Sequence, residues 1–213
     1  MKIVSILAAI LFATHLMAGA SGLTKKTGVM APVNDAVVVA PADTAALARE
    51  KAIVCAACHG EDGNSPNGAY PILAGQTSRY LYLQLKDYKE GRRKDPVMSA
   101  MAVNLSKEDL RALADYFASR KPKSNGFSAD EAKAGKGKAV ADAALCTMCH
   151  LGGFSGQNEI PRVGGQHFDY IVKQLKDFRA RNRTNDAGNM TSVSKGLSDD
   201  DIENLAHYIA GLN

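Results

Sequence analysis

Hydrophobic residues recur at helical spacing over most of the chain after residue 42, and the pattern occurs twice. Apolar residues on one face predict a middle helix over about 78–89 in the first half and over 167–179 in the second. A later segment in each half opens with serine, followed three residues on by aspartate, which resembles a capping box with aspartate in place of glutamate. Apolar stripes behind these serines predict two core-facing helices. The stripes are Leu110, Leu113, Ala114 and Phe117 in the first half, and Ile202, Leu205, Ala206 and Ile209 in the second.

A third helix is expected at the start of each half. The first is predicted over 45–58 and the second over about 129–149, although Gly135 and Gly137 weaken the second prediction. Because every periodic segment has a helical period, the sequence predicts an all-α fold.

The two halves are copies of one unit. Gly75-Gln76 returns as Gly165-Gln166, an offset of 90 positions (165 minus 75), and the other matching segments have offsets of 90 to 92. A stretch of Pro, Gly and polar residues at 121–126 marks the connection between the copies. We therefore predict two domains, 43–123 and 124–213.

The first 20 residues (1–20) have the organisation of a secretory signal peptide. A basic start, an apolar stretch over 3–13 and the small residues Ala18-Gly19-Ala20 match its three regions. The apolar stretch is shorter than the about 20 residues of a transmembrane helix, so we predict cleavage, export to the bacterial periplasm and no transmembrane segment in the mature chain; an uncleaved anchor is the alternative. Residues 21–42 are interpreted as a disordered or loosely docked leader, in which Val37-Val38-Val39 could instead form a short strand.

The candidate chemistry is concentrated in two pentapeptides that together use all 4 cysteines of the chain. They are Cys55-Ala56-Ala57-Cys58-His59 and Cys146-Thr147-Met148-Cys149-His150. The Cys-x-x-Cys-His pattern is typical of c-type haem attachment. On a helix its three side chains lie along one face, so two thiols can bond to the haem vinyl groups while the imidazole reaches the iron. The sequence therefore predicts two covalently bound haem c groups.

Two other chemistries use paired cysteines. Four thiolates could form a zinc site, but zinc motifs place their cysteine pairs closer together, and such a site would not explain the two histidines. A redox-active disulfide is expected beside a βαβ pattern, which neither motif has. Both alternatives are weaker than haem attachment.

The second axial ligand of each haem iron separates electron transfer from ligand or oxygen chemistry. Met98 lies seven residues before Leu105, and Met190 lies seven residues before Leu197, so both halves keep methionine at one register. His/Met ligation is a known cytochrome c arrangement. We therefore predict that these methionines complete the coordination begun by His59 and His150. With both axial positions filled, the iron is suited to one-electron transfer.

The other histidines and methionines are given structural interpretations. His15 lies in the predicted signal segment, and His167 and His207 have no counterpart in the other half, so they are interpreted as surface residues. Met101 is interpreted as a core filler because the equivalent position is valine. Met148 lies between two cysteines and is not expected to reach the iron.

A proline in each half precedes the repeated Gly-Gln. Pro71 and Pro161 have free carbonyl groups that could accept the second ring N–H of His59 and His150. Alternatively, each proline only shapes its loop. The residues alone leave both interpretations open.

The charge of the chain argues against nucleic-acid binding. There are 26 Lys and Arg against 22 Asp and Glu, a net charge of +4 that is too small for that class of protein. The balance is 13 against 10 over 43–123, or +3, and 10 against 11 over 124–213, or −1. Arg92-Arg93-Lys94 is interpreted as a solvated face. The alternative is that it docks to an acidic partner, with electron-transfer rates that fall as salt rises.

These features together resemble the di-haem cytochrome c4 family over about residues 43–213: a signal peptide, Cys-x-x-Cys-His, a Pro-x-Leu-x-Gly-Gln-like loop, methionine, and Leu-Ser-x-x-Asp opening a helix. The resemblance implies two tandem class I cytochrome c domains related by pseudo-twofold symmetry, with haem propionates near their interface. It also supports Pro71 and Pro161 as carbonyl partners of the haem-binding histidines. The segment His150-Leu151-Gly152-Gly153 departs from the first half's His59-Gly60-Glu61-Asp62-Gly63, so this loop is expected to differ.

The function implied by the resemblance is that of a periplasmic electron carrier, not an enzyme. Its expected partners are respiratory redox proteins, namely a membrane donor complex and a terminal haem-copper oxidase. The competing interpretations are a haem subunit of a periplasmic dehydrogenase and a di-haem peroxidase.

Overall fold

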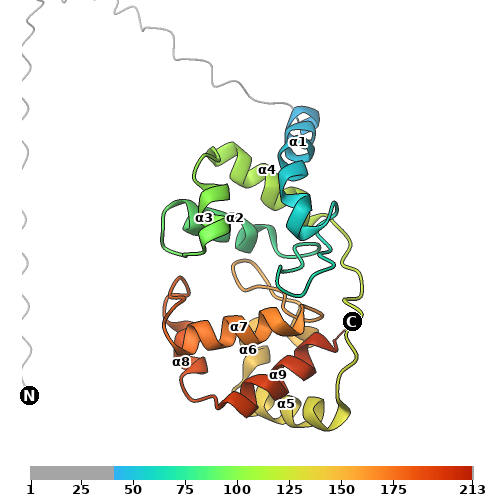
Figure 1. The fold of residues 1–213 in the computed structure, drawn as a ribbon, viewed down its shortest axis with the longest axis vertical. Coiled ribbons are helices and arrows are strands. Elements are labelled where there is room, and N and C mark those ends of the chain that lie inside the picture. Colours follow the sequence, from blue (N-terminus) through green and yellow to red (C-terminus); the bar gives the residue numbers. More distant parts are fainter. Residues whose placement is uncertain (1–40, 213) are drawn as a thin grey trace, which may run out of the picture. The chain divides into compact units, whose positions relative to one another are not determined.

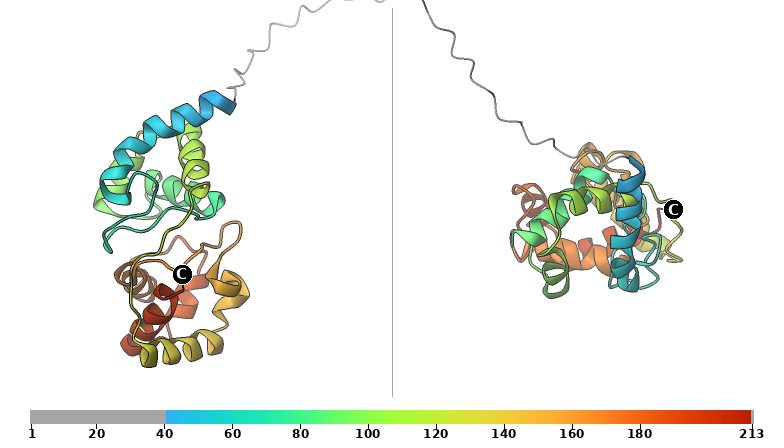
Figure 2. Two further views of the ribbon diagram at one scale, coloured as in Figure 1. Left: turned by 90° about the vertical axis from the view of Figure 1, so that its right-hand side faces the viewer. Right: turned by 90° about the horizontal axis from the view of Figure 1, so that it is seen from above.

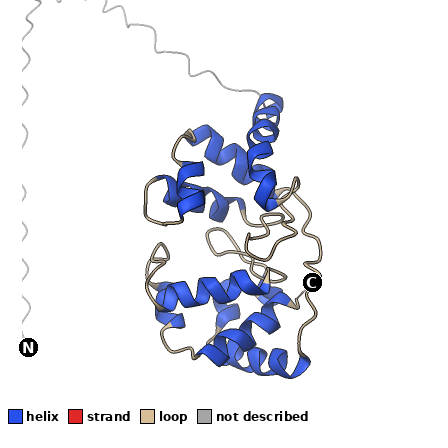
Figure 3. Ribbon diagram, in the orientation of Figure 1, coloured by secondary structure: helices blue, strands red, loops and turns tan. Residues whose placement is uncertain are grey.

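The computed structural model describes residues 41–212, with side chains from residue 44 onward. The predicted signal peptide, nearly all of the predicted leader and the possible strand at Val37–Val39 lie outside the described residues. Within them the structure is helical and has no β-strand, only one isolated antiparallel bridge between Gln157 and Ile160 (Figure 3). The predicted all-α class is therefore confirmed.

The helices fall into two groups, one for each half of the sequence (Figure 1). The first group has α1 (Pro41–His59), α2 (Ser78–Lys89), α3 (Pro96–Ala102) and α4 (Lys107–Ala118). The second has α5 (Glu131–Ala143), α6 (Cys146–His150), a 3-10 turn (Gly152–Phe154), α7 (Phe168–Arg179), α8 (Asn189–Ser194) and α9 (Asp199–Ala210).

Each group has its own apolar core. In the first, α2 and α4 contribute Leu81, Leu113 and Phe117, which pack with α1. In the second, Ile171 and Ile202 belong to a larger cluster built from α5, α7 and α9. All eight residues of the two predicted stripes are buried, so the positions assigned from periodicity are confirmed.

The predicted capping boxes open α4 and α9. The Ser106 hydroxyl accepts a hydrogen bond from the Asp109 backbone N–H, and the Asp109 carboxylate accepts one from the Ser106 N–H. Ser198 and Asp201 make the same pair of bonds. Because both partners lie within one turn, the local sequence is sufficient to define these helix starts.

The prediction of one continuous helix over about 129–149 is wrong. The segment divides into α5 and α6 at Leu145, whose φ of 54° places it in the left-handed region, where a right-handed helix cannot continue. Gly137 has a packing role instead: a Cβ built there would lie 2.0 Å from the Asn204 carbonyl oxygen of α9. The glycine therefore permits close approach of α5 and α9.

Two short helices, α3 and α8, were not predicted, and they carry Met98 and Met190. Asp95 caps α3 by accepting hydrogen bonds from the backbone N–H groups of Val97 and Met98. Helices of 7 and 6 residues complete too few turns to show an amphipathic period.

The two helical groups are joined by reciprocal hydrogen bonds from the repeated glutamines. The Gln76 side chain donates to the Arg162 carbonyl at 2.7 Å and accepts from its N–H at 2.7 Å. The Gln166 side chain donates to the Ile72 carbonyl at 3.0 Å and accepts from its N–H at 2.8 Å. Positions 72 and 162 are themselves equivalent in the repeat, so the contact is exchanged as a pseudo-twofold axis requires. The left view of Figure 2 shows the two helical groups one above the other.

No helix among residues 41–212 is long and apolar enough to cross a membrane.

Candidate functional site

Each Cys-x-x-Cys-His motif lies on a helix in the structure. The first occupies the last turn of α1, and the second forms the whole of α6. The two histidines are buried, with 6% of His59 and 8% of His150 exposed, while the cysteines remain more accessible. The helical backbone thus presents two thiols and an imidazole along one face.

The two histidines have the same second partner. Nδ1 of His59 lies 2.9 Å from the Pro71 carbonyl oxygen, and Nδ1 of His150 lies 2.9 Å from the Pro161 carbonyl oxygen. A carbonyl can only accept, so Nδ1 carries the proton and Nε2 is left with a free lone pair. Burial lowers the pKa of both imidazoles, opposed by the hydrogen bond to the proline carbonyl. Both histidines are therefore held neutral, the form that binds a metal.

A cavity of about 1040 Å³ connects the two motifs. Its lining is mainly apolar and includes the cysteines and histidine of both motifs. Met98 and Met190 line it as well, as do Pro71 and Pro161. All ten residues that the sequence assigned to haem binding therefore border this one cavity. Those residues are Cys55, Cys58, His59, Pro71, Met98, Cys146, Cys149, His150, Pro161 and Met190.

The thiols do not have the properties of the alternative chemistries. Burial raises the pKa of Cys55 and of Cys146, whereas a reactive redox cysteine has a depressed thiol pKa. All four cysteines are unpaired. Over the described range, no group of three or more His, Cys, Asp or Glu side chains is arranged to hold a metal ion.

Several residues interpreted as surface or core residues have the opposite environment. His167 is only 7% exposed, and its Nε2 lies 2.9 Å from the Ser65 carbonyl oxygen in the other half, so its interpretation as a surface residue is wrong. His207 is half-buried and packs against Phe127 and Phe168. Met101, expected as a core filler, lies instead in the wall of the cavity.

The interpretation of Arg92-Arg93-Lys94 as one solvated face is also wrong. Arg92 and Lys94 are exposed, but Arg93 is only 6% exposed and hydrogen-bonds to residues of the other half. Sequence reasoning missed this buried polar contact. A signal was present, because Arg93 and Arg183 are separated by the same 90 positions as the glutamines (183 minus 93).

Comparison with known proteins identifies the family of the chain. The sequence model of the family described as cytochrome c matches the chain twice, at residues 42–121 and 134–213. The chain is 42% identical over 181 residues to cytochrome c4 of Pseudomonas aeruginosa, covering 81% of this chain and 90% of that protein. The chain belongs to the cytochrome c4 family.

The structural and more distant relatives are consistent with that assignment. The crystal structure of reduced recombinant cytochrome c4 from Pseudomonas stutzeri matches with a TM-score of 0.74 and 42% identity, over 79% of this chain and 98% of that one. The chain is also 35% identical over 182 residues to a protein of Thiomonas intermedia (strain K12) named thiosulfate dehydrogenase electron acceptor, covering 80% of this chain and 83% of that protein.

As a cytochrome c4, the chain has two tandem cytochrome c domains, carries two covalent haem c groups and is an electron carrier. The residues present fit these groups: paired thiols and a neutral histidine lie on each motif, beside an apolar cavity. The predicted all-α fold of two such domains and the predicted cofactors are confirmed.

Proposed function

We propose that this member of the cytochrome c4 family carries single electrons through two His/Met-ligated haems in the periplasm. When bound, each haem supplies an iron that alternates between Fe(III) and Fe(II). The chain provides the thioether cysteines Cys55, Cys58, Cys146 and Cys149, and the axial ligands His59 with Met98 and His150 with Met190. The observation that supports these roles is that both methionines border the same cavity as both histidines, whose Nδ1 atoms are already held by the proline carbonyls.

The supporting groups act on the ligands. The Pro71 and Pro161 carbonyls would fix the orientation and tautomer of the two imidazoles, since each accepts the Nδ1 proton. Buried apolar side chains around the cavity would exclude water, and a methionine ligand raises the reduction potential relative to a more basic ligand. The chain is thereby suited to deliver electrons to an oxidising acceptor.

We further propose a place between respiratory complexes. Residues 1–20 would direct export and be removed, the domains would comprise 43–123 and 124–213, and the partners would be a membrane donor complex and a terminal haem-copper oxidase. The similarity to a thiosulfate dehydrogenase electron acceptor favours one specific alternative, in which a periplasmic dehydrogenase is the donor.

Replacement of each methionine tests the ligands. In Met98→Ala and in Met190→Ala, one haem is expected to lose its sulfur-to-iron charge-transfer band and to fall in reduction potential, while the other haem is unchanged. Met101→Ala is the matched control for Met98, because Met101 lies on the same helix, is 42% exposed and is assigned no ligand role. Unchanged spectra and potentials in both ligand variants would refute the assignment.

The donor and the enzyme alternatives need kinetic tests. Purified holoprotein should be reduced by a respiratory donor and reoxidised by a haem-copper oxidase. Rapid reduction only by thiosulfate dehydrogenase with thiosulfate would favour the dehydrogenase route. Peroxide turnover with loss of the charge-transfer band on half-reduction would instead show a di-haem peroxidase.

A further inference from the structure

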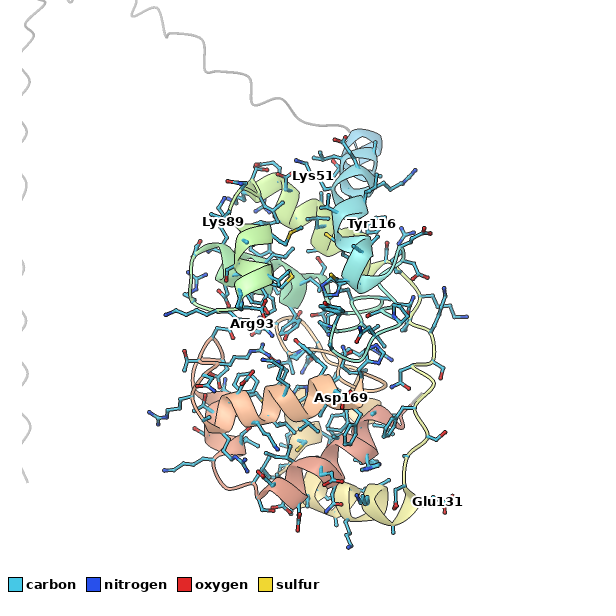
Figure 4. All side chains as sticks on the ribbon, viewed as in Figure 1. Lys51, Lys89, Arg93, Tyr116, Glu131 and Asp169 are labelled. Atoms are coloured by element: carbon cyan, nitrogen blue, oxygen red, sulfur yellow. The ribbon has the colours of Figure 1, made fainter. Side chains whose placement is uncertain are left out.

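Two buried arginines lie where the two domains meet. Arg93 is 6% exposed and Arg183 is 8% exposed. Figure 4 labels Arg93 at the level where the two helical groups approach each other. Its guanidinium donates to the Gln84 side-chain oxygen at 2.8 Å within its own domain, and to the Tyr170 hydroxyl and the Gln174 side-chain oxygen, both at 2.9 Å, in the other.

Arg183 makes the equivalent set of contacts from the second domain. It donates to the Tyr80 hydroxyl at 3.0 Å and to Gln84 at 3.0 Å across the interface, and to Gln174 at 2.6 Å in its own domain. Each domain therefore supplies an arginine to the tyrosine of the other, and both arginines share the same two glutamines. The guanidinium groups also lie over aromatic rings of their own domains, at 4.7 Å for Arg93 and 4.4 Å for Arg183.

The direct hydrogen-bond acceptors of these two cations are all neutral. Neither forms an ion pair with a carboxylate among the residues that the structure describes. The carboxylate that enters this network, Asp87, accepts from Asn185 and is itself paired with Arg92 at 2.7 Å. Burying a guanidinium without a counter-charge is costly, because desolvation is not offset by an opposite charge.

The charge of Arg183 acts across the domain boundary on Tyr80, and Arg93 acts on the same tyrosine from within its own domain. Burial tends to raise the pKa of Tyr80, but the charges of Arg183 and Arg93 outweigh it and lower that pKa. Both arginines also border the cavity that contains the two Cys-x-x-Cys-His motifs. A charge in this buried region is weakly screened by solvent, so it acts over a longer range than a charge on the surface.

We propose that Arg93 and Arg183 are positioning residues shared by both haems. Their guanidinium groups would hold the haem carboxylates at the domain boundary by charge-assisted hydrogen bonds. Their charge would also raise the potentials of both irons together, since a nearby positive charge favours Fe(II) over Fe(III). The inference rests on the proposed function only in that both haems are bound and redox-active.

The test is a redox titration of Arg93→Gln holoprotein, followed spectroscopically. Both haem potentials should fall, each by at least a tenfold change in the Fe(III)/Fe(II) ratio at fixed applied potential, or about 59 mV for one electron. Arg183→Gln should produce the same joint fall. Arg111→Gln, which removes an exposed positive charge from α4, is the charge-matched control and should move neither potential comparably.

A second control separates charge from interface packing. Gln76→Leu removes two hydrogen bonds across the interface without a change of charge, so it should lower the stability to urea but leave both potentials in place. Arg93→Lys keeps the charge and should retain potentials near those of the parent protein while stability falls.

The outcomes distinguish the possibilities. A shift of one haem only, or shifts no larger than those of Arg111→Gln, would overturn the shared role, as would equal falls in Arg93→Lys and Arg93→Gln. If Arg93→Gln does not fold, Arg183→Gln tests whether loss of the charge lowers both potentials, and Arg93→Lys tests whether keeping the charge preserves them. A parent protein without two redox-active haems would instead refute the proposed function.

Discussion

An ion pair between Asp62 and Lys123 ties the loop that follows His59 to the segment that connects the two domains. Lys123 Nζ lies 2.7 Å from the Asp62 carboxylate. The hydrogen bond from Lys123 is the main cause that lowers the pKa of Asp62 to about 2, despite a small opposing effect of burial. Asn64 adds a second tie, because its side chain bonds to the backbone of residues 121 and 123.

Asp62→Asn should therefore have a pH-dependent effect on stability. The folded pKa lies below the unfolded value of about 3.9, so the stabilisation is fully present above that value and is lost as pH falls through about 2. The pair is exposed, so the loss near neutral pH should be no more than about 1 kcal/mol and should shrink in high salt. Urea unfolding of both proteins near neutrality and at a pH of about 2 measures the difference.

Lys123→Gln is the reciprocal control, because it removes the same pair from the other side. Near neutrality it should lower the free energy of unfolding by the same amount as Asp62→Asn. At acid pH, where Asp62 is protonated, it should be as stable as the parent protein. A constant difference between the parent protein and Asp62→Asn at both pH values would show that the charge of Asp62 is not the cause.

Residue patterns predict the haem-attachment motifs and candidate ligands better than they predict the buried polar contacts. The Cys-x-x-Cys-His motifs and the equivalent methionines could be found because their spacing is local and repeated. His167 is interpreted as a surface residue because it has no counterpart in the other half, and Arg93 because a run of charged residues usually forms a solvated face. Their partners belong to the other domain, and no local pattern contains that information.

At the scale of elements, the two glycines of α5 provide a matched pair. A Cβ at Gly137 would lie 2.0 Å from the Asn204 carbonyl oxygen, whereas one at Gly135 would meet nothing within 4 Å. Gly135→Ala should stabilise the protein by about 0.5–1 kcal/mol through helix propensity. Gly137→Ala gains the same propensity but should be destabilising by about 1–3 kcal/mol, because backbone atoms must move. Thermal unfolding of the two holoproteins makes the comparison.

The sign of the difference is decisive for these variants. If Gly137→Ala were as stable as Gly135→Ala, the close packing of α5 on α9 would be wrong. The sequence correctly predicts a helix across the two glycines, but it does not predict the break at Leu145. Helix propensity is visible in the sequence, whereas the left-handed residue that redirects the chain is leucine, which carries no turn signal.

At the scale of the whole molecule, duplication made the fold predictable and the interface difficult to predict. The offset of 90 positions identified two equivalent units, and the stripes of α4 and α9 defined their cores. The offset also applied to Gln76 and Gln166, but nothing in one sequence shows that such a pair is exchanged between domains. The structure shows that each copy completes the polar contacts of the other.

We expect each domain to depend on its haem for a complete core, and the two domains should not depend on it equally. The buried apolar cluster of the second domain contains nine residues, among them Ile202, Leu205 and Phe154. The cluster of the first contains five, and three of them are Leu113, Leu81 and Phe117. Counted over all buried apolar residues, the first domain has 11 and the second 10, but only five in the first are Ile, Leu or Phe, against seven in the second. We therefore expect the haem to supply a larger share of the buried apolar surface in the first domain.

Removing one attachment site at a time tests this difference. Cys55→Ala with Cys58→Ala should leave the first domain largely unfolded, with a loss of helical circular dichroism and rapid proteolysis. Cys146→Ala with Cys149→Ala should leave a second domain that is loosened but retains more helix, since its larger cluster remains. Each variant keeps the other haem as an internal control for maturation. Equal loss of helix in the two variants, or greater loss in the second, would show that core size does not set the dependence on haem.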